Sequence, residues 1–111
     1  MFKNIKNLFK SKNENSRAFR MEMAEKISNK IIKYTAERVD DVELVIGREG
    51  SISLRNGQII VLSGGNIVMR TNVEDMHASE LLSLDGVIIT APDLEQGGKE
   101  RTIIAYYKYF R

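Results

Sequence analysis

The chain has 111 residues, enough for one domain and too few for two. A composition of 42% hydrophobic and 29% charged residues excludes wholesale disorder, and the absence of cysteine excludes a disulfide framework, a thiolate nucleophile and a cysteine-ligated zinc site. No stretch approaches the ~18 continuous apolar residues of a membrane-spanning helix. We therefore expect a cytoplasmic protein, peripheral to the membrane at most.

Basic residues are concentrated at the N-terminus. Residues 1–20 carry six basic side chains and one acidic side chain, a charge of +5, whereas residues 21–111 carry a charge of −3. We therefore treat residues 1–16 as a basic arm, followed by a single domain at 17–111. Apolar side chains in the arm recur at the spacing of one helical face, with lysines around them. The candidate contact residues of the arm are Phe2, Lys3, Ile5, Lys6, Phe9 and Lys10.

This arm has two interpretations. It can bind a partner protein or an anionic membrane, where each lysine contributes about 1 kcal/mol and apolar insertion adds to that. It can equally be a solubilising tail, or a helix folded back onto its own domain. A helix of about ten residues is marginal in water, so in the first interpretation the helix forms on contact.

The next segment has the pattern of a long amphipathic helix, from Arg17 to Arg38. At ~1.5 Å per residue it is about 33 Å long, enough to cross a small sheet. Because such a helix is stable mainly when its apolar stripe is buried, we expect it to pack on the strands that follow. The stripe contains Phe19, Met23, Ala24, Ile27, Ile31 and Tyr34.

From residue 42 onwards the hydrophobic pattern is that of β-strands. Asn56-Gly57 lies between two alternating runs, and it favours a type I′ hairpin because both central residues of that turn need a positive φ. Gly47–Gly50 and Ser63–Asn66 are two further predicted turns. The strands between these turns form an antiparallel meander: Val42–Ile46, Ser51–Arg55, Gln58–Leu62 and Ile67–Arg70.

The first of these strands is a candidate for self-association. Val42–Ile46 contains no proline, and an exposed edge strand pairs readily with its symmetry mate. Asp40, Asp41 and Glu43 are candidate gatekeepers against that pairing. The sequence is compatible with both a monomer and a dimer.

Residues 71–84 fit two structures. A helix at 73–79 is slightly favoured, because the residues before it have capping-box spacing. The rival interpretation is a strand at 80–84 that turns at Asp85-Gly86 into a strand at 87–90.

The last element, Arg101–Phe110, is rich in β-branched and aromatic residues and apolar on both faces, which is typical of a central strand. The predicted fold is therefore α+β. We expect a long N-terminal amphipathic helix packed on a mostly antiparallel, strongly curved sheet of about six strands, or on a small open barrel.

Patterns that indicate catalysis or metal binding are weak. His77 is the single histidine, and with Glu74 and Glu80 it offers at best an open metal site; a solvated acidic face is the commoner arrangement. Gly97-Gly98-Lys99 lacks the earlier glycine and the following Ser or Thr of a phosphate-binding loop. Paired carboxylates, such as Asp93 and Glu95, lie where turns favour acidic residues. We predict no catalytic residue, cofactor, metal ion or small-molecule substrate.

The C-terminal strand carries a second binding signal. Tyrosines next to basic residues are typical of single-stranded nucleic acid binding, although tyrosine is also common in strands for packing reasons. The candidate nucleic-acid surface contains Arg101, Tyr107, Lys108, Tyr109 and Arg111. We predict a non-catalytic binding or regulatory module that acts through contacts with a protein partner or a second copy, with the arm as a tether. The alternative is a small RNA- or DNA-binding regulator.

Overall fold

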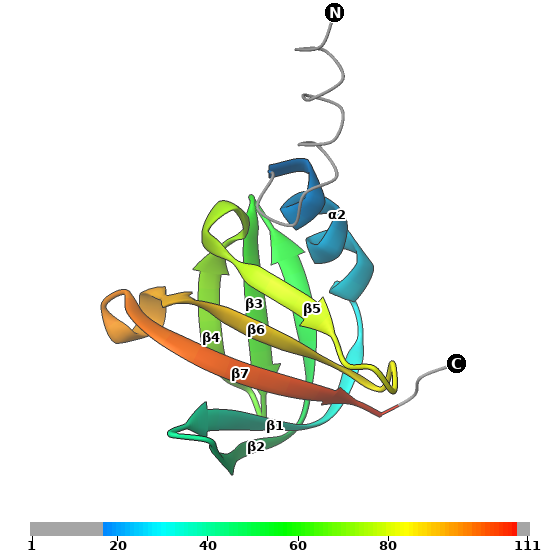
Figure 1. Ribbon diagram of the computed structural model, residues 1–111, viewed down its shortest axis with the longest axis vertical. Helices are drawn as coiled ribbons and strands as arrows, with labels where there is room; N and C mark the ends of the chain where they lie inside the picture. Colours follow the sequence, from blue (N-terminus) through cyan, green and yellow to red (C-terminus); the bar gives the residue numbers. More distant parts are fainter. Residues whose placement is uncertain (1–16, 109–111) are drawn as a thin grey trace, which may run out of the picture.

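The computed structural model describes residues 17–108; residues 1–16 and 109–111 lie outside the described part. Within that part, one α-helix and seven antiparallel strands form a strongly curled sheet with the helix across one end (Figure 1). The strand order is β4-β3-β2-β1-β7-β6-β5. The elements are α2 (Arg17–Ile27), β1 (Ile31–Val39), β2 (Val42–Arg55), β3 (Gln58–Ser63), β4 (Asn66–Asn72), β5 (His77–Glu80), β6 (Gly86–Asp93) and β7 (Lys99–Tyr107), with short 3-10 helices η1 (Val73–Asp75) and η2 (Leu94–Gln96).

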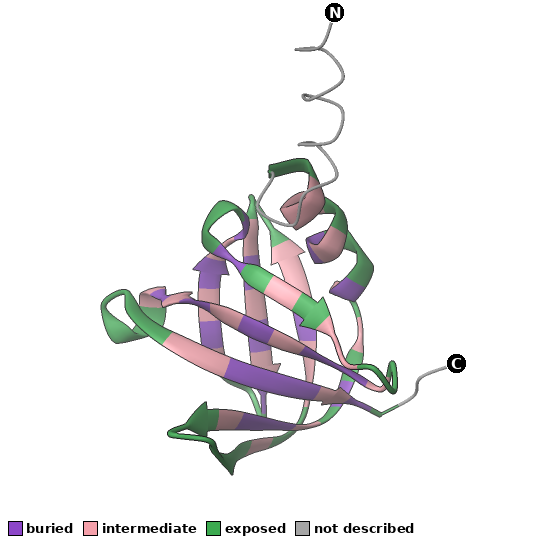
Figure 2. Ribbon diagram, viewed as in Figure 1, coloured by how far each residue is buried: buried purple, intermediate pink, exposed green. Residues whose placement is uncertain are grey.

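The predicted α+β fold with a curved antiparallel sheet is confirmed, with seven strands in residues 17–108 in place of about six. The apolar core lies between the concave face of the sheet and α2, and the distal part of the β1–β2 hairpin lies outside it (Figure 2). The one α-helix of the described part is not long and apolar enough to cross a membrane.

The predicted helix from Arg17 to Arg38 is wrong beyond Ile27, because residues 31–39 form strand β1. Asn29 adopts a left-handed conformation, with φ of 66°, that ends the helix. The β-branched residues that follow are paired on both sides, with β2 and with β7, and these two ladders outweigh the helical spacing of the apolar residues.

The Asn56-Gly57 hairpin is confirmed, with φ of 49° and 75° at its two central residues. The predicted turn at Gly47–Gly50 is wrong, since β2 runs through it as one strand of 14 residues. The register with β1 shifts at this point and leaves Ile46 as an extra residue, a β-bulge. At Gly50 the backbone passes so close to β3 that an added Cβ would lie 1.7 Å from the carbonyl oxygen of Leu62. The glycines here therefore permit close strand crossing and not a chain reversal.

The helix favoured at 73–79 is also wrong. Only the three residues of η1 are helical, and β5 then pairs with β6 from His77 to Glu80. The rival strand at 80–84 is wrong as well, because residues 81–85 connect β5 to β6. Pairing along β6 and burial of Val73 and Met76 outweigh the capping signal, which is worth little in so short a segment. β7 has neighbours on both sides, as predicted for the last strand.

Candidate interaction surface

Strand β2 has two halves with different neighbours. Its second half, from Gly50 to Arg55, pairs with β3, whereas residues 42–47 pair with β1 alone. Between the two halves, the amide of Gly64 donates to the carbonyl of Glu49 at 3.2 Å, and this bond ties the strand to the β3–β4 turn. The outer edge of residues 42–47 therefore has no neighbouring strand in the described part of the chain. The prediction of an edge strand at Val42–Ile46 is confirmed.

Exposed aliphatic side chains gather on this part of the hairpin. Of the nine large hydrophobic residues that are exposed in the described chain, five lie there, and Leu44 is 55% exposed. They cover both faces, because Leu44 lies opposite Glu37 on the concave side and Val45 lies opposite Ala36 on the convex side. We call these five residues the hairpin surface: Val39, Val42, Leu44, Val45 and Ile46.

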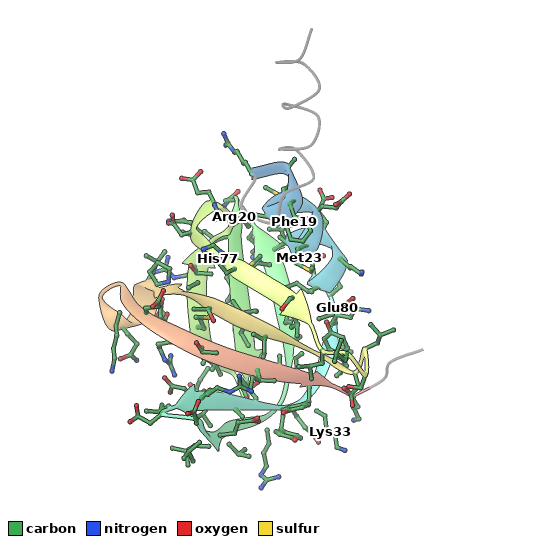
Figure 3. All side chains as sticks on the ribbon, in the orientation of Figure 1. Phe19, Arg20, Met23, Lys33, His77 and Glu80 are labelled. Atoms are coloured by element: carbon green, nitrogen blue, oxygen red, sulfur yellow. The ribbon has the colours of Figure 1, made fainter. Side chains whose placement is uncertain are left out.

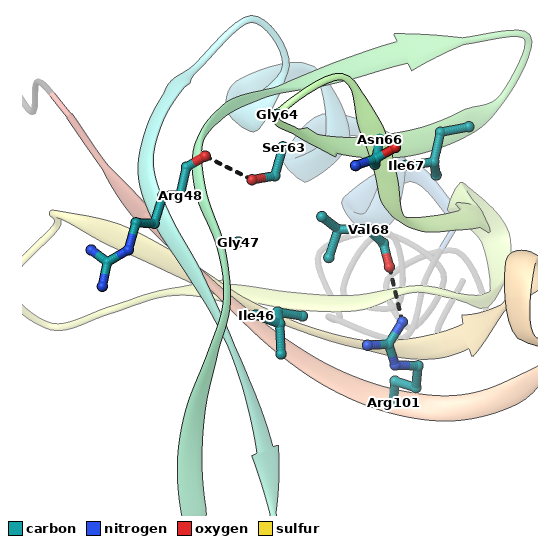
Figure 4. Close-up of a pocket in the computed structure, with 9 residues that line it drawn as sticks. All are labelled: Ile46, Gly47, Arg48, Ser63, Gly64, Asn66, Ile67, Val68 and Arg101. Atoms are coloured by element: carbon teal, nitrogen blue, oxygen red, sulfur yellow. Dashed lines mark hydrogen bonds between the residues drawn. The ribbon is translucent and has the colours of Figure 1, made fainter.

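A cavity of about 410 Å³ adjoins the hairpin surface where β2 separates from β3 (Figure 4). Ile46 belongs to both, so the apolar surface continues from the hairpin into the cavity. Ile67 and Val68 of β4 line the opposite wall, and Arg101 of β7 lies at its base. Ser63 contributes a hydroxyl that donates to the carbonyl of Arg48 at 2.8 Å.

Beneath this cavity, the guanidinium of Arg101 forms hydrogen bonds that join β7 to β1, β6 and β4. Its Nε and Nη2 donate to the two carboxylate oxygens of Glu37 at 3.0 and 2.8 Å. Its Nη1 donates to Asp93 at 2.6 Å and to the carbonyl of Val68 at 2.9 Å. Strand β4 is thus joined to β7 by side-chain bonds and not by a strand ladder. Asp93 also accepts from the amides of Arg70 and Glu95.

These contacts also fix the charge states. Hydrogen bonding and charge attraction from Arg101 hold the pKa of the Glu37 carboxyl below its usual value. The same bond, together with the one to Asp93, raises the pKa of Arg101. Arg101 is a structural cation that already uses four of its five N–H donors, so it offers little to an anionic ligand in the cavity.

The convex side of the hairpin is supported by two stacked tyrosines. The rings of Tyr34 and Tyr106 have centroids 4.5 Å apart, and the hydroxyl of Tyr106 donates to Glu43 at 2.8 Å. Burial, followed by the bond to Glu43, raises the pKa of Tyr106 to about 12. Glu43 also accepts from Arg38 at 3.4 Å. Glu43 therefore ties β2 to β7 and is engaged within the domain.

The predicted nucleic-acid surface is divided by the fold. Arg101 and Tyr107 face the interior, and the hydroxyl of Tyr107 points to Glu80 at 3.5 Å. Lys108 is exposed, and Tyr109 and Arg111 lie outside the described residues. The arm residues Phe2, Lys3, Ile5, Lys6, Phe9 and Lys10 also lie outside them, so their role stays a prediction.

The acidic residues near His77 in the sequence, Glu74 and Glu80, do not form a metal site with it. Nε2 of His77 lies 3.4 Å from a guanidinium nitrogen of Arg20, and Glu80 pairs with Lys26 at 3.0 Å (Figure 3). Within residues 17–108, no group of three acidic or histidine side chains converges as metal ligands.

No protein-family model, curated protein or solved structure matches the chain. Function is therefore inferred from the geometry of the hairpin surface. The sequence does not predict the β1 strand of this hairpin, which carries Val39, because the spacing of its apolar residues favours a helix up to Arg38. The available signal was Val39-Asp40-Asp41-Val42, where two turn-compatible residues separate β-branched ones. Both aspartates have positive φ, 50° and 66°, as in a two-residue hairpin.

Proposed function

We propose that this protein is a non-catalytic interaction module that binds another polypeptide chain through the hairpin surface. One observation carries the proposal: five exposed aliphatic side chains lie together on a projecting hairpin, beside a strand edge that has no neighbour among residues 17–108. Clustered exposed apolar side chains mark interaction sites, and an open edge accepts an extended strand through its backbone groups.

The energetics support strand addition. Fully burying one aliphatic side chain contributes about 1.5–3 kcal/mol, so complete cover of all five half-exposed ones would yield on the order of 4–7 kcal/mol before the costs of association, which is the upper limit for one added strand. Alternate amides and carbonyls along residues 42–47 add backbone hydrogen bonds, and the side chains select the partner. The cavity beside Ile46 provides space for a side chain of the bound strand.

Site-specific photo-crosslinking in cells tests this function. A photoreactive residue at Leu44 is expected to give discrete adducts with polypeptides. The matched control is Leu82, which is apolar and fully exposed in the β5–β6 connection, away from the hairpin. Adducts of equal yield from both positions, or none from Leu44, contradict the proposal.

We also propose that the basic arm brings the module to an anionic membrane or partner surface. The support is its sequence alone, in which four lysines and one glutamate accompany spaced apolar residues. The full chain is expected to co-sediment with anionic vesicles and not with neutral ones. Equal partitioning to both, or to neither, contradicts the membrane tether.

A further inference from the structure

The geometry points to a second copy of this chain as the polypeptide that pairs with the open edge of β2. This inference rests on the proposed function and names its partner. The two copies associate as an antiparallel β2–β2 pair about a two-fold axis, which joins two curled sheets edge to edge. The reasons are a self-complementary register and complementary charges at the two ends of the edge.

Symmetry restricts the register. In an antiparallel pair, opposite residues point to the same face, so a two-fold axis perpendicular to the sheet must pass between two copies of one residue. Centred on Leu44, the pair places Leu44 against Leu44, and Val42 of each copy against Ile46 of the other. Leu44 lies on the concave side, and the bulge directs Ile46 into the concave cavity (Figure 4). All three pairs on the concave side are therefore aliphatic, and on the convex side Glu43 of each copy lies against Val45 of the other.

The neighbouring registers are poorer. A pair centred on Glu43 would place two carboxylates directly opposite each other, which is destabilising. A pair centred on Val45 also has three aliphatic pairs, but it would place Val42 against Arg48 and would bring Asp41 of each copy opposite Glu49 of the other, where two like charges repel. The pair centred on Leu44 avoids both of these like-charge contacts and keeps an aliphatic side chain opposite Ile46 at the cavity.

The ends of the edge carry opposite charges. Asp40 and Asp41 at the hairpin tip are exposed and make no ion pair within residues 17–108. Arg48, at the other end of the open edge, is exposed and likewise makes no ion pair with described residues. In the register centred on Leu44, the acidic tip of each copy lies beside Arg48 of the other, twice by symmetry. The aspartates thus select this partner and repel an acidic strand.

The length of the edge sets the strength of the pair. Residues 42–47 span about 20 Å at ~3.3 Å per residue, which gives an interface at the small end of specific ones. We therefore expect a reversible dimer whose population rises with concentration and falls with added salt.

Sedimentation equilibrium of the full chain, from low micromolar to submillimolar concentration, is the first test. The wild type is expected to show a monomer–dimer equilibrium. Leu44→Lys is expected to weaken it by at least about tenfold, a factor equal to 1.4 kcal/mol, whereas Leu82→Lys, at a more exposed position outside the hairpin, leaves it unchanged. A chain that stays monomeric at every concentration, or a dimer indifferent to Leu44→Lys, overturns the inference.

Charge exchange and a cysteine probe test the register. Arg48→Asp is expected to weaken the dimer, and adding Asp40→Lys and Asp41→Lys to it is expected to restore it. Because the chain contains no cysteine, Leu44→Cys is expected to form an intermolecular disulfide on mild oxidation, whereas Leu82→Cys does not. No rescue, or equal disulfide formation at both positions, overturns the register. Circular dichroism melting of each variant shows that it is folded.

The two proposals fail separately. Photo-adducts from Leu44 with other proteins, in a chain that stays monomeric, overturn the second copy and leave the interaction module standing. Adducts at twice the mass of the chain support both. No adduct from Leu44 and no dimer overturn both.

Discussion

Replacing Arg101 by methionine removes the cation that joins three parts of the sheet and keeps an unbranched apolar side chain in place of the aliphatic part of arginine. Four hydrogen bonds are lost: two to Glu37, one to Asp93 and one to the carbonyl of Val68. Asp93 is completely buried, and the Arg101 side chain is only 11% exposed. The substitution therefore leaves a carboxylate in the interior without its counter-charge.

Breaking a buried ion pair by removing one partner typically costs about 3–5 kcal/mol. Asp93 keeps two backbone donors, the amides of Arg70 and Glu95, which continue to stabilise its charge. We therefore expect the lower end, a loss of about 3 kcal/mol in the free energy of unfolding. That is a large part of the ~5–15 kcal/mol of a typical domain.

Urea unfolding followed by circular dichroism measures this loss. Lys108→Met, at the exposed end of the described residues, is the matched control and is expected to change stability by less than about 0.5 kcal/mol. Adding Asp93→Asn to Arg101→Met should cost less than the sum of the single changes, because it removes the uncompensated charge. If Arg101→Met costs less than about 1 kcal/mol, the joining role assigned to this residue is refuted.

Three further predictions concern the sheet. Gly50→Ala is expected to lower the free energy of unfolding by about 3 kcal/mol or more, because the added Cβ meets the carbonyl of Leu62. Gly57→Ala places its Cβ in open space but requires φ of 75°, so it is expected to cost about 1–2 kcal/mol. A larger loss for Gly57→Ala than for Gly50→Ala in urea unfolding contradicts this prediction. Because folding lowers the pKa of Glu37, its ionised carboxylate stabilises the folded protein at neutral pH, and this stabilisation is lost as the pH falls through the folded-state pKa. Glu37→Gln is therefore expected to lose less stability than the wild type on acidification below pH about 5. Equal slopes in urea titrations at successive pH values refute that. Thr35 is buried with no partner for its hydroxyl among described residues, so Thr35→Val is expected to raise the melting temperature, with a gain of about 1 kcal/mol; a fall contradicts the assignment.

Local turn chemistry was the most readable part of the sequence. Asn56-Gly57 predicted its hairpin because two successive positive φ values restrict the choice of residue strongly. The β1 strand was not readable in the same way. Ile31 and Tyr34 continue the helical stripe of α2, and the competing ladder is made with β7, whose residue Tyr107 pairs with Ile32 from the far end of the chain. Such long-range pairing leaves no local pattern, and the one local signal for β1 is the Asp40-Asp41 turn that joins it to β2.

The candidate interaction surface could likewise be predicted only where it depends on local sequence. The edge at Val42–Ile46 was visible because it combines β-branched residues with acidic neighbours. The cavity behind it depends on Arg101, which meets Glu37 across 64 positions of sequence. The neighbouring tyrosines and basic residues in the sequence predict that Arg101 lies on an exposed basic surface. In the structure it instead lies in the interior, where it pairs with Glu37 and Asp93. The interior position of Arg101 therefore depends on β1, β6 and β7 coming together in the fold, which the local sequence does not show.

Strand β2 is one continuous strand that belongs to both the hairpin surface and the core, and this continuity has a thermodynamic consequence. Its outer half presents the hairpin surface, and its inner half carries Ile52 in the core, with no break in the strand between them. A bound strand that pairs with the outer half of native β2 therefore stabilises the native state of the whole domain by mass action. A rise in melting temperature with ligand or protein concentration would then report occupancy of the hairpin from any probe in the core.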